Sequence, residues 1–165
     1  MVGLLLSATL NITPFQLHKY AEPSAQSTQE LTAHPQQNTP ALVSAEDGLV
    51  PLGGVEVTLP VRVRNVADLG AVTAEIGYDN TVTAPVQCRV NRAAFPTGIC
   101  NAAYDSNGDG APDAVRFALL TVSSVSAPAD APVVMVDITW IATATAAVGI
   151  TTPLQVTAQL RQLQR

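Results

Sequence analysis

Apolar and polar residues alternate along several short stretches of this chain, with the period of two expected of strands that bury one face. In the clearest stretch, the hydrophobic residues from Val57 to Val63 alternate with Thr58, Pro60 and Arg62. Pro60 cannot donate a backbone hydrogen bond, so this strand is expected at a sheet edge or with a bulge. The stretches predict strands over residues 55–64, 72–78, 82–90, 114–122, 133–145 and 153–160.

The same alternation predicts which side chains face the core. Roughly seven short strands joined by polar turns, without a convincing amphipathic helix, predict an all-β fold, an antiparallel β-sandwich or a barrel. The side chains expected to point inward are Val55, Val57, Leu59, Val61, Val63, Val72, Ala74, Ile76, Tyr78, Val134, Val136, Ile138, Trp140, Leu154, Val156, Ala158 and Leu160.

The first 40 residues differ from the rest of the chain. Val2 to Leu10 is an apolar run with the length of a signal-peptide core, too short to span a bilayer, although no basic residue precedes it. Residues 22–40 are rich in Gln, Ser, Thr and Pro, a composition that buries too little apolar surface to order itself. We therefore predict a signal remnant and disordered linker over residues 1–40, one β-sandwich domain over residues 41–165, and no membrane-spanning segment.

Composition and charge exclude several functions. Hydrophobic residues make up 47% of the chain but aromatic residues only 4%, so the core must consist largely of small aliphatic side chains. The net charge of −5 argues against nucleic acid, whose phosphates require a basic patch. Both histidines, His18 and His34, precede the predicted domain, which therefore lacks the base of a Ser-His-Asp or Cys-His site. We predict that the protein is not an enzyme.

Oxygen-bearing side chains are regularly spaced in one nine-residue segment. Asp105, Asn107, Asp109 and Asp113 occupy its first, third, fifth and ninth places, with glycine at the sixth, a pattern in which short loops wrap Ca2+. An EF-hand would place Glu at the twelfth position, where Arg116 stands within a predicted strand. The segment is more similar to the Asp-rich loops of thrombospondin type-3 repeats. It predicts a structural calcium site, and the alternative is a solvated turn, since turns also favour Asp, Asn and Gly.

Two cysteines, Cys88 and Cys100, flank the polar stretch 89–99. In an oxidising compartment a disulfide between them would close this stretch and stabilise the fold by about 3 kcal/mol through restriction of the unfolded chain. The alternative is a pair of reduced, unlinked thiols. We favour the disulfide because the calcium-like segment also indicates a secreted, extracellular or cell-surface protein.

Four segments of the predicted domain follow one another in a characteristic order. The first two are Val57-Thr-Leu-Pro-Val-Arg-Val-Arg-Asn-Val66 and Leu69-Gly-Ala-Val-Thr-Ala-Glu-Ile-Gly-Tyr-Asp79, a strand followed by a Leu-Gly turn and a strand that ends in Tyr-Asp. The later two are Pro132-Val-Val-Met-Val-Asp-Ile-Thr-Trp-Ile141 and Ala146-Ala-Val-Gly-Ile-Thr-Thr-Pro-Leu154. In order and spacing, over roughly residues 42–160, these segments resemble a cohesin domain.

This resemblance implies a nine-stranded jelly-roll sandwich, related to carbohydrate-binding modules, that docks a dockerin-like protein module, often in polysaccharide-degrading assemblies. The cysteine pair and the Asp-rich segment are not general features of the family. The chain also ends at Arg165, before the strand that usually closes the family's sandwich. No segment identifies the residues that would contact a partner.

Two further functions stay open, namely polysaccharide binding on the same fold and a structural spacer in a cell-surface protein. Sheets that bind sugars usually present exposed aromatic rings. Within the predicted domain only Phe95 and Tyr104 lie outside the inward register, which disfavours polysaccharide binding.

Overall fold

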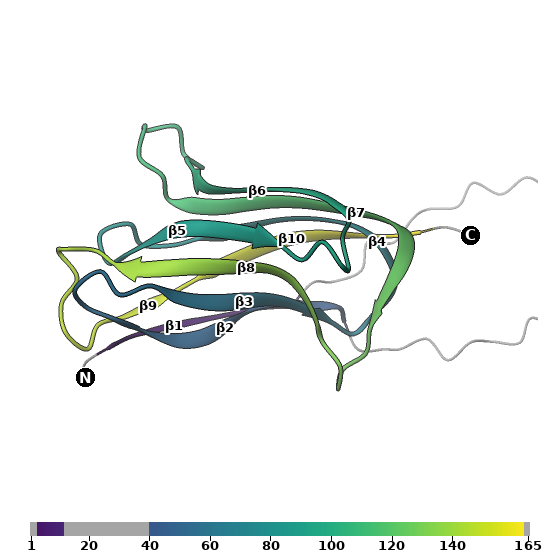
Figure 1. Cartoon of the computed structure of the whole chain (residues 1–165), viewed down its shortest axis with the longest axis horizontal. Helices are drawn as coiled ribbons and strands as arrows, with labels where there is room; N and C mark the ends of the chain where they lie inside the picture. The colour runs from purple at the N-terminus through teal and green to yellow at the C-terminus, as the bar shows by residue number, and fades with distance from the viewer. Residues whose placement is uncertain (1–2, 12–39, 164–165) are drawn as a thin grey trace, which may run out of the picture.

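The computed structural model describes residues 3–11 and 40–163, which fold into two stacked β-sheets (Figure 1). These residues contain ten strands and no helix. The strands are β1 (Gly3–Asn11), β2 (Leu42–Pro51), β3 (Val57–Arg64), β4 (Val66–Gly77), β5 (Thr83–Val90), β6 (Thr97–Tyr104), β7 (Ala114–Ala127), β8 (Val133–Ala142), β9 (Thr151–Pro153) and β10 (Gln155–Gln162).

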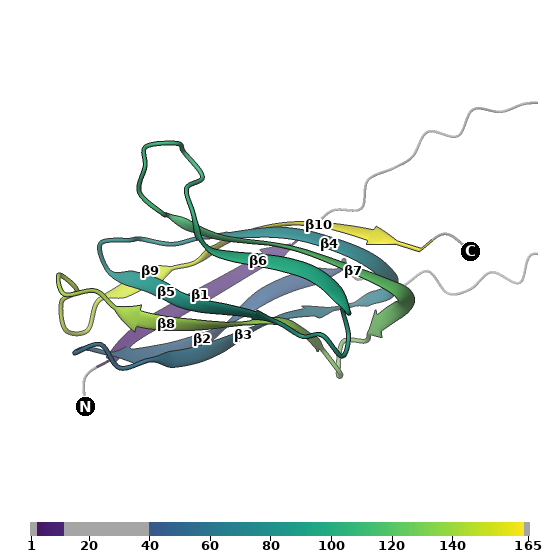
Figure 2. The same ribbon diagram turned by 45° about the horizontal axis from the view of Figure 1, so that its top comes forward.

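The two sheets differ in size. The six-stranded sheet has the order β5-β8-β3-β2-β1-β9, and the four-stranded sheet has the order β10-β4-β7-β6. Figure 2 shows the smaller sheet stacked over the larger one. All neighbouring strands are antiparallel except β1 and β9, which are parallel. The predicted all-β sandwich is therefore confirmed.

The core lies between the two sheets. Its largest fully buried side chains are Trp140, Phe95 and Phe117, and most of the remainder are Val, Leu, Ile and Ala. The Tyr78 ring meets the Trp140 ring edge-on, with centroids 5.5 Å apart and an interplanar angle of 79°. Such edge-to-face pairs contribute about 0.5–1.5 kcal/mol beyond the area that they bury. This pair therefore compensates in part for the scarcity of aromatic residues.

The strand that contains Pro60 shows how a proline is accommodated inside a sheet. β3 lies between β2 and β8, but it pairs with β2 only from Val61 to Arg64, so the β2 side of the strand is open at Pro60. Its register with β8 shifts directly after Val61. Pro60 therefore stands at a local edge, as one of the two alternatives predicted, while the bulge in this pairing has its extra residue on β8. Across the shift Met135 of β8 has no register partner in β3, and it is fully buried. Val134, which was predicted to face inward, is only half-buried because the bulge reverses the alternation there.

Two other predicted strands differ from the structure. Val55 precedes β3 and is 50% exposed, so its predicted inward orientation is wrong. The single strand predicted over residues 153–160 is two strands, β9 in the larger sheet and β10 in the smaller one. Leu154 lies where the chain crosses between the sheets and is buried as predicted.

The N-terminal segment is part of the larger sheet rather than separate from the domain. β1 pairs antiparallel with β2, from Gly3 opposite Pro51 to Asn11 opposite Leu42. A short apolar run has the sequence character of a signal-peptide core and of a buried strand alike, so its pattern does not distinguish the two. The predicted linker falls on residues 12–39, which lie outside the described residues, and it stays a prediction. Within the described ranges no helix has the length and apolar character needed to cross a bilayer.

Candidate functional site

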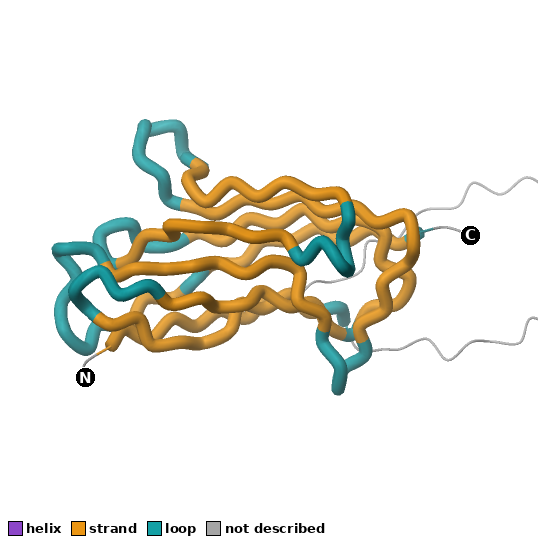
Figure 3. Tube along the Cα trace, viewed as in Figure 1, coloured by secondary structure: helices purple, strands orange, loops and turns teal. Residues whose placement is uncertain are grey.

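Residues 105–113, the segment predicted to bind calcium, form the loop between β6 and β7 and project from the end of the sandwich (Figure 3). Asp105 organises this loop. Its Oδ1 accepts a hydrogen bond from the Gly108 N–H and its Oδ2 accepts one from the Gly110 N–H, both at 2.7 Å. Both glycines have positive φ, 78° and 90°, which a residue with a side chain rarely adopts. The bond from Gly110 is the main reason why the pKa of Asp105 lies below its ordinary value.

The other predicted calcium ligands also accept hydrogen bonds within the loop. Asn107 and Asp109 each accept one from the backbone N–H two residues further on. The Asp113 carboxylate accepts from the N–H and the hydroxyl of Ser106. Across residues 3–11 and 40–163, no three Asp, Glu, His or Cys side chains gather closely enough to hold a metal ion. The oxygen donors suit Ca2+ in kind but are not assembled around one point, so the calcium site stays a prediction.

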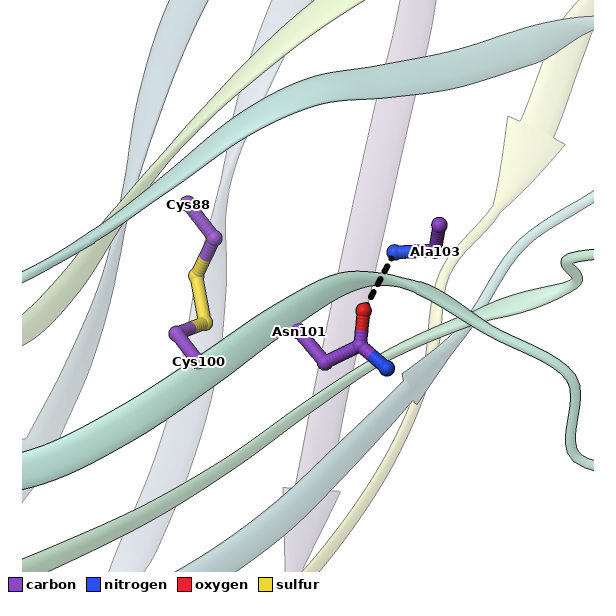
Figure 4. The surroundings of a disulfide bond; sticks show 4 residues. All are labelled: Cys88, Cys100, Asn101 and Ala103. Atoms are coloured by element: carbon purple, nitrogen blue, oxygen red, sulfur yellow. Dashed lines mark hydrogen bonds between the residues drawn. A yellow bond between two sulfur atoms is a disulfide. The ribbon is translucent and has the colours of Figure 1, made fainter.

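The predicted disulfide between Cys88 and Cys100 is present, with the two Cα atoms 5.9 Å apart (Figure 4). Cys88 belongs to β5, the outermost strand of the larger sheet, and Cys100 belongs to β6, the outermost strand of the smaller sheet. The bond therefore joins the two sheets at one side of the sandwich. Next to it, the Asn101 side chain accepts a hydrogen bond from the Ala103 N–H at 3.0 Å, which secures the end of β6.

The outer face of the four-stranded sheet presents an ordered set of side chains. Because the four strands are in register, their outward residues align in rows across the sheet. In the order β10, β4, β7 and β6, three successive rows are Arg161, Ala71, Leu120 and Thr97, then Gln159, Thr73, Ala118 and Ile99, then Thr157, Glu75, Arg116 and Asn101.

One side of this face is apolar and exposed. Ile99 of β6 is 75% exposed, and Leu120 of β7 is 53% exposed in the neighbouring row. Val122 follows two residues further along β7 and is 93% exposed. We call these three residues the β6–β7 patch. Burial of one such side chain contributes about 1.5–3 kcal/mol, so a partner that covered all three would gain substantial affinity.

Polar and charged residues border the patch. Glu75 and Arg116 are register partners in the third row, an arrangement in which opposite charges stabilise a sheet. The Arg116 guanidinium lies over the Tyr104 ring, 4.9 Å from its centroid, and also donates a hydrogen bond to the Tyr104 hydroxyl. An apolar centre with a polar rim is the usual anatomy of a protein–protein interface.

The two aromatic residues considered for sugar stacking are not exposed platforms. Phe95 is fully buried in the core, so its availability to a ligand is excluded. Tyr104 is half-buried and its ring is occupied by Arg116. The structure therefore provides no stacking surface from either residue.

A shallow depression of about 410 Å³ lies beside the 105–113 loop, where β4 and β10 meet it. Tyr78, Asp79 and Asp113 contribute to its wall. Burial, and secondarily the Asp113 carboxylate, raise the pKa of Tyr78 above its ordinary value. The Asp79 carboxylate is held by the N–H and hydroxyl of Thr81, and these bonds lower its pKa. The depression is thus a polar extension of the four-stranded face.

Comparisons with known proteins identify the fold. No family model and no curated protein matches the sequence. Among solved structures, the cohesin CaCohA2 of Clostridium acetobutylicum, in complex with a variant of CaDoc0917, is 15% identical over 70% of this chain and 86% of its own, with a TM-score of 0.54. The sixth cohesin of Acetivibrio cellulolyticus scaffoldin B, in complex with a mutant of the Cel5 dockerin, is 12% identical over 68% of this chain and 79% of its own, with a TM-score of 0.51. The chain therefore has a cohesin-like fold, as its sequence predicted.

The β6–β7 patch was not identified from the sequence, although β7 carried a signal. Around Leu119 and Leu120, apolar residues face both sides of the strand, whereas a strand with one solvent-exposed face should alternate apolar and polar residues. Ile99 gave no such signal, because it lies at the end of the stretch 89–99, which was interpreted as a polar loop. Only the pairing of β6 with β7 brings Ile99 beside Leu120.

Proposed function

We propose that this chain is a non-catalytic attachment module that binds a dockerin-type protein through the outer face of the four-stranded sheet. The observation that carries the proposal is the β6–β7 patch, three exposed apolar side chains on neighbouring strands of one sheet. Fold likeness alone does not define a function, so the patch supplies the site that the proposal needs. The cohesins of the same fold that were solved in complexes with CaDoc0917 and with the Cel5 dockerin add support.

We place the module outside the cell, in a secreted or cell-surface protein. The disulfide between Cys88 and Cys100 supports this proposal, because such bonds persist in oxidising compartments and are rare in the cytosol. A role in polysaccharide degradation would then come from the enzymes or scaffolds that the module holds. Direct glycan binding has less support, since Phe95 is buried and Tyr104 lies beneath Arg116.

We propose further that Ca2+ stabilises the 105–113 loop. A carboxylate has about four lone-pair sites, and two of those on Asp105 accept the N–H groups of Gly108 and Gly110. The N–H groups of Asn107 and Asp109 also interact with this carboxylate, so a cation would have to displace some of these bonds. Binding would require Asp109 and Asp113 to turn toward the same point, and Asp113 would have to release Ser106. The cation would act on stability, and we assign it no role in chemistry.

A binding panel tests the proposed function. The immobilised full chain is exposed to dockerin modules, including CaDoc0917 and the Cel5 dockerin, and separately to insoluble cellulose, xylan and chitin. We expect saturable binding to at least one dockerin and no retention on the glycans. Retention on a glycan without any dockerin binding would support a carbohydrate-binding module instead, and binding to neither would support a spacer domain.

A further inference from the structure

The N-terminal strand β1 has an unusual connection to the sheet that contains it. Asn11 at its end lies opposite Leu42 at the start of β2, yet the 30 residues from 12 to 41 separate them in the chain. A hairpin between antiparallel neighbours needs only about 2–5 residues. The covalent connection therefore does not force β1 to pair with the β2 of its own chain.

The position that β1 occupies is a slot between two other strands. β2 pairs with it antiparallel along its whole length, and β9 pairs with Leu5 to Ser7 in parallel on the other side. The residues on either side of the slot belong to the core, since Val43 and Val50 of β2 and Thr152 of β9 are buried. An empty slot would leave unpaired backbone groups along β2, which is a template for another extended strand.

The sequence of β1 favours such pairing. The segment Gly-Leu-Leu-Leu-Ser-Ala-Thr-Leu-Asn contains no charged residue and no proline. Charges, prolines and short edges are the usual means by which proteins prevent strands of different chains from pairing. β1 contains neither charges nor prolines, and eight residues of β2 pair with it, on both sides of a register break between Leu6 and Ala8.

We propose that the slot between β2 and β9 accepts residues 3–11 of a second copy of this chain as well as its own, so that the module forms strand-exchanged oligomers. The tether from residue 12 to residue 41, at up to about 3.3–3.6 Å per residue, reaches on the order of 100 Å, far beyond a neighbouring molecule. A tether of this kind gives a strand an effective concentration of about millimolar at its own slot. Pairing with a second chain therefore competes with pairing inside one chain when the protein is concentrated. Two chains that exchange β1 reciprocally form a closed dimer.

Cysteine pairing across two chains tests the proposal. Thr9 and Ser44 are register partners, and the chain's two native cysteines are already joined to each other. Full chains with Thr9→Cys are mixed with full chains with Ser44→Cys. The mixture is unfolded in urea at low pH without reductant, because thiol exchange is slow there and the native disulfide stays intact. It is then refolded at a protein concentration of about 10 µM or about 1 mM and oxidised. Thr58→Cys, at an exposed position on β3, is the matched control for Ser44→Cys.

A single chain that carries both Thr9→Cys and Ser44→Cys serves as the calibration chain. At low concentration it should form a disulfide between positions 9 and 44 of the same chain, which verifies that these residues are paired. The proposal predicts a covalent Thr9–Ser44 heterodimer at 1 mM, at least about tenfold more abundant than at 10 µM and than with the Thr58→Cys partner. Internal closure of the calibration chain without any heterodimer would overturn the proposal, because β1 would then serve its own chain only. Failure of the calibration chain to close would also overturn it, since β1 would not pair with β2.

Discussion

Cys88 and Cys100 are separated by 12 positions in the sequence but join the outermost strands of opposite sheets, with their Cα atoms 5.9 Å apart. The chain between them leaves β5, places Phe95 in the core with no exposed surface, and enters β6. The disulfide therefore closes one side of the sandwich and anchors the strand that carries Ile99 of the β6–β7 patch.

Removal of this disulfide should destabilise the protein markedly. Replacing both cysteines with alanine frees the loop between Cys88 and Cys100 in the unfolded chain, which should lower the free energy of unfolding by about 3 kcal/mol. Urea titration followed by circular dichroism measures the loss. The wild-type chain in reductant should lose a similar amount, and unchanged stability in both samples would show that the bond does not restrain the fold.

Phe95 should behave as a core residue rather than a ligand contact. Phe95→Ala should cost about 3–5 kcal/mol of stability, because it removes a large, fully buried ring and leaves a cavity. Tyr104→Ala is the aromatic control, with an expected loss of at most about 2.5 kcal/mol for one cation–π contact and its hydrogen bond. A Phe95→Ala protein of wild-type stability would contradict the placement of this ring.

Calcium should raise the melting temperature if the 105–113 loop binds it. Saturation at about 100 times the dissociation constant would add about 2.7 kcal/mol by mass action. The full chain is melted with calcium and with chelator, beside Asp109→Ala and beside Asp130→Ala, an exposed acidic residue outside the loop. Only Asp109→Ala should lose the response. Identical melts of the wild-type chain under both conditions would refute the calcium proposal.

Acid should weaken the 105–113 loop through Asp105. Hydrogen bonds, chiefly from Gly110, lower the pKa of its carboxylate in the folded protein below the ordinary 3.8. The unfolded chain therefore binds more protons near this pH, and the stabilisation is present above 3.8 and lost as the pH falls through the lower folded pKa. Amide exchange of Gly108 and Gly110 should accelerate over this window. Asp105→Asn cannot titrate at this position, so its amide exchange should show no such acceleration from this residue. Wild-type exchange rates at Gly108 and Gly110 without this acceleration would contradict the prediction.

Much of the fold followed from the sequence because period-two alternation reports one buried face directly. Val61, Ile76 and Trp140 are buried as that pattern predicted. The alternation failed where pairing, which is a non-local property, changed the register. The bulge at Met135 of β8 reversed the inward side, and the break at Leu154 sent two halves of one apparent strand to different sheets.

The candidate site was less accessible to prediction. The disulfide could be anticipated from two cysteines and the implied compartment, but the fact that it joins two sheets depends on the strand order. The Asp-rich segment was recognisable, yet its spacing suits a hydrogen-bonded turn as well as a cation site, since Asp105 and Asp109 accept backbone N–H groups in this structure. The β6–β7 patch arises from residues about 20 positions apart and required the register of β6 with β7.

The proposal that the β6–β7 patch holds the protein partner is tested by changing the patch itself. Leu120→Asp places a charge in the centre of the patch, and Val86→Asp makes the same change on β5 of the other sheet, at a side chain that is 45% exposed. Affinity for the dockerin that binds best in the panel is measured by calorimetry, after melting curves establish that both variants are folded. We expect affinity to fall about 100-fold for Leu120→Asp, the effect of a central interface residue, and less than about threefold for Val86→Asp. Wild-type affinity of Leu120→Asp would contradict the proposal that this face holds the partner.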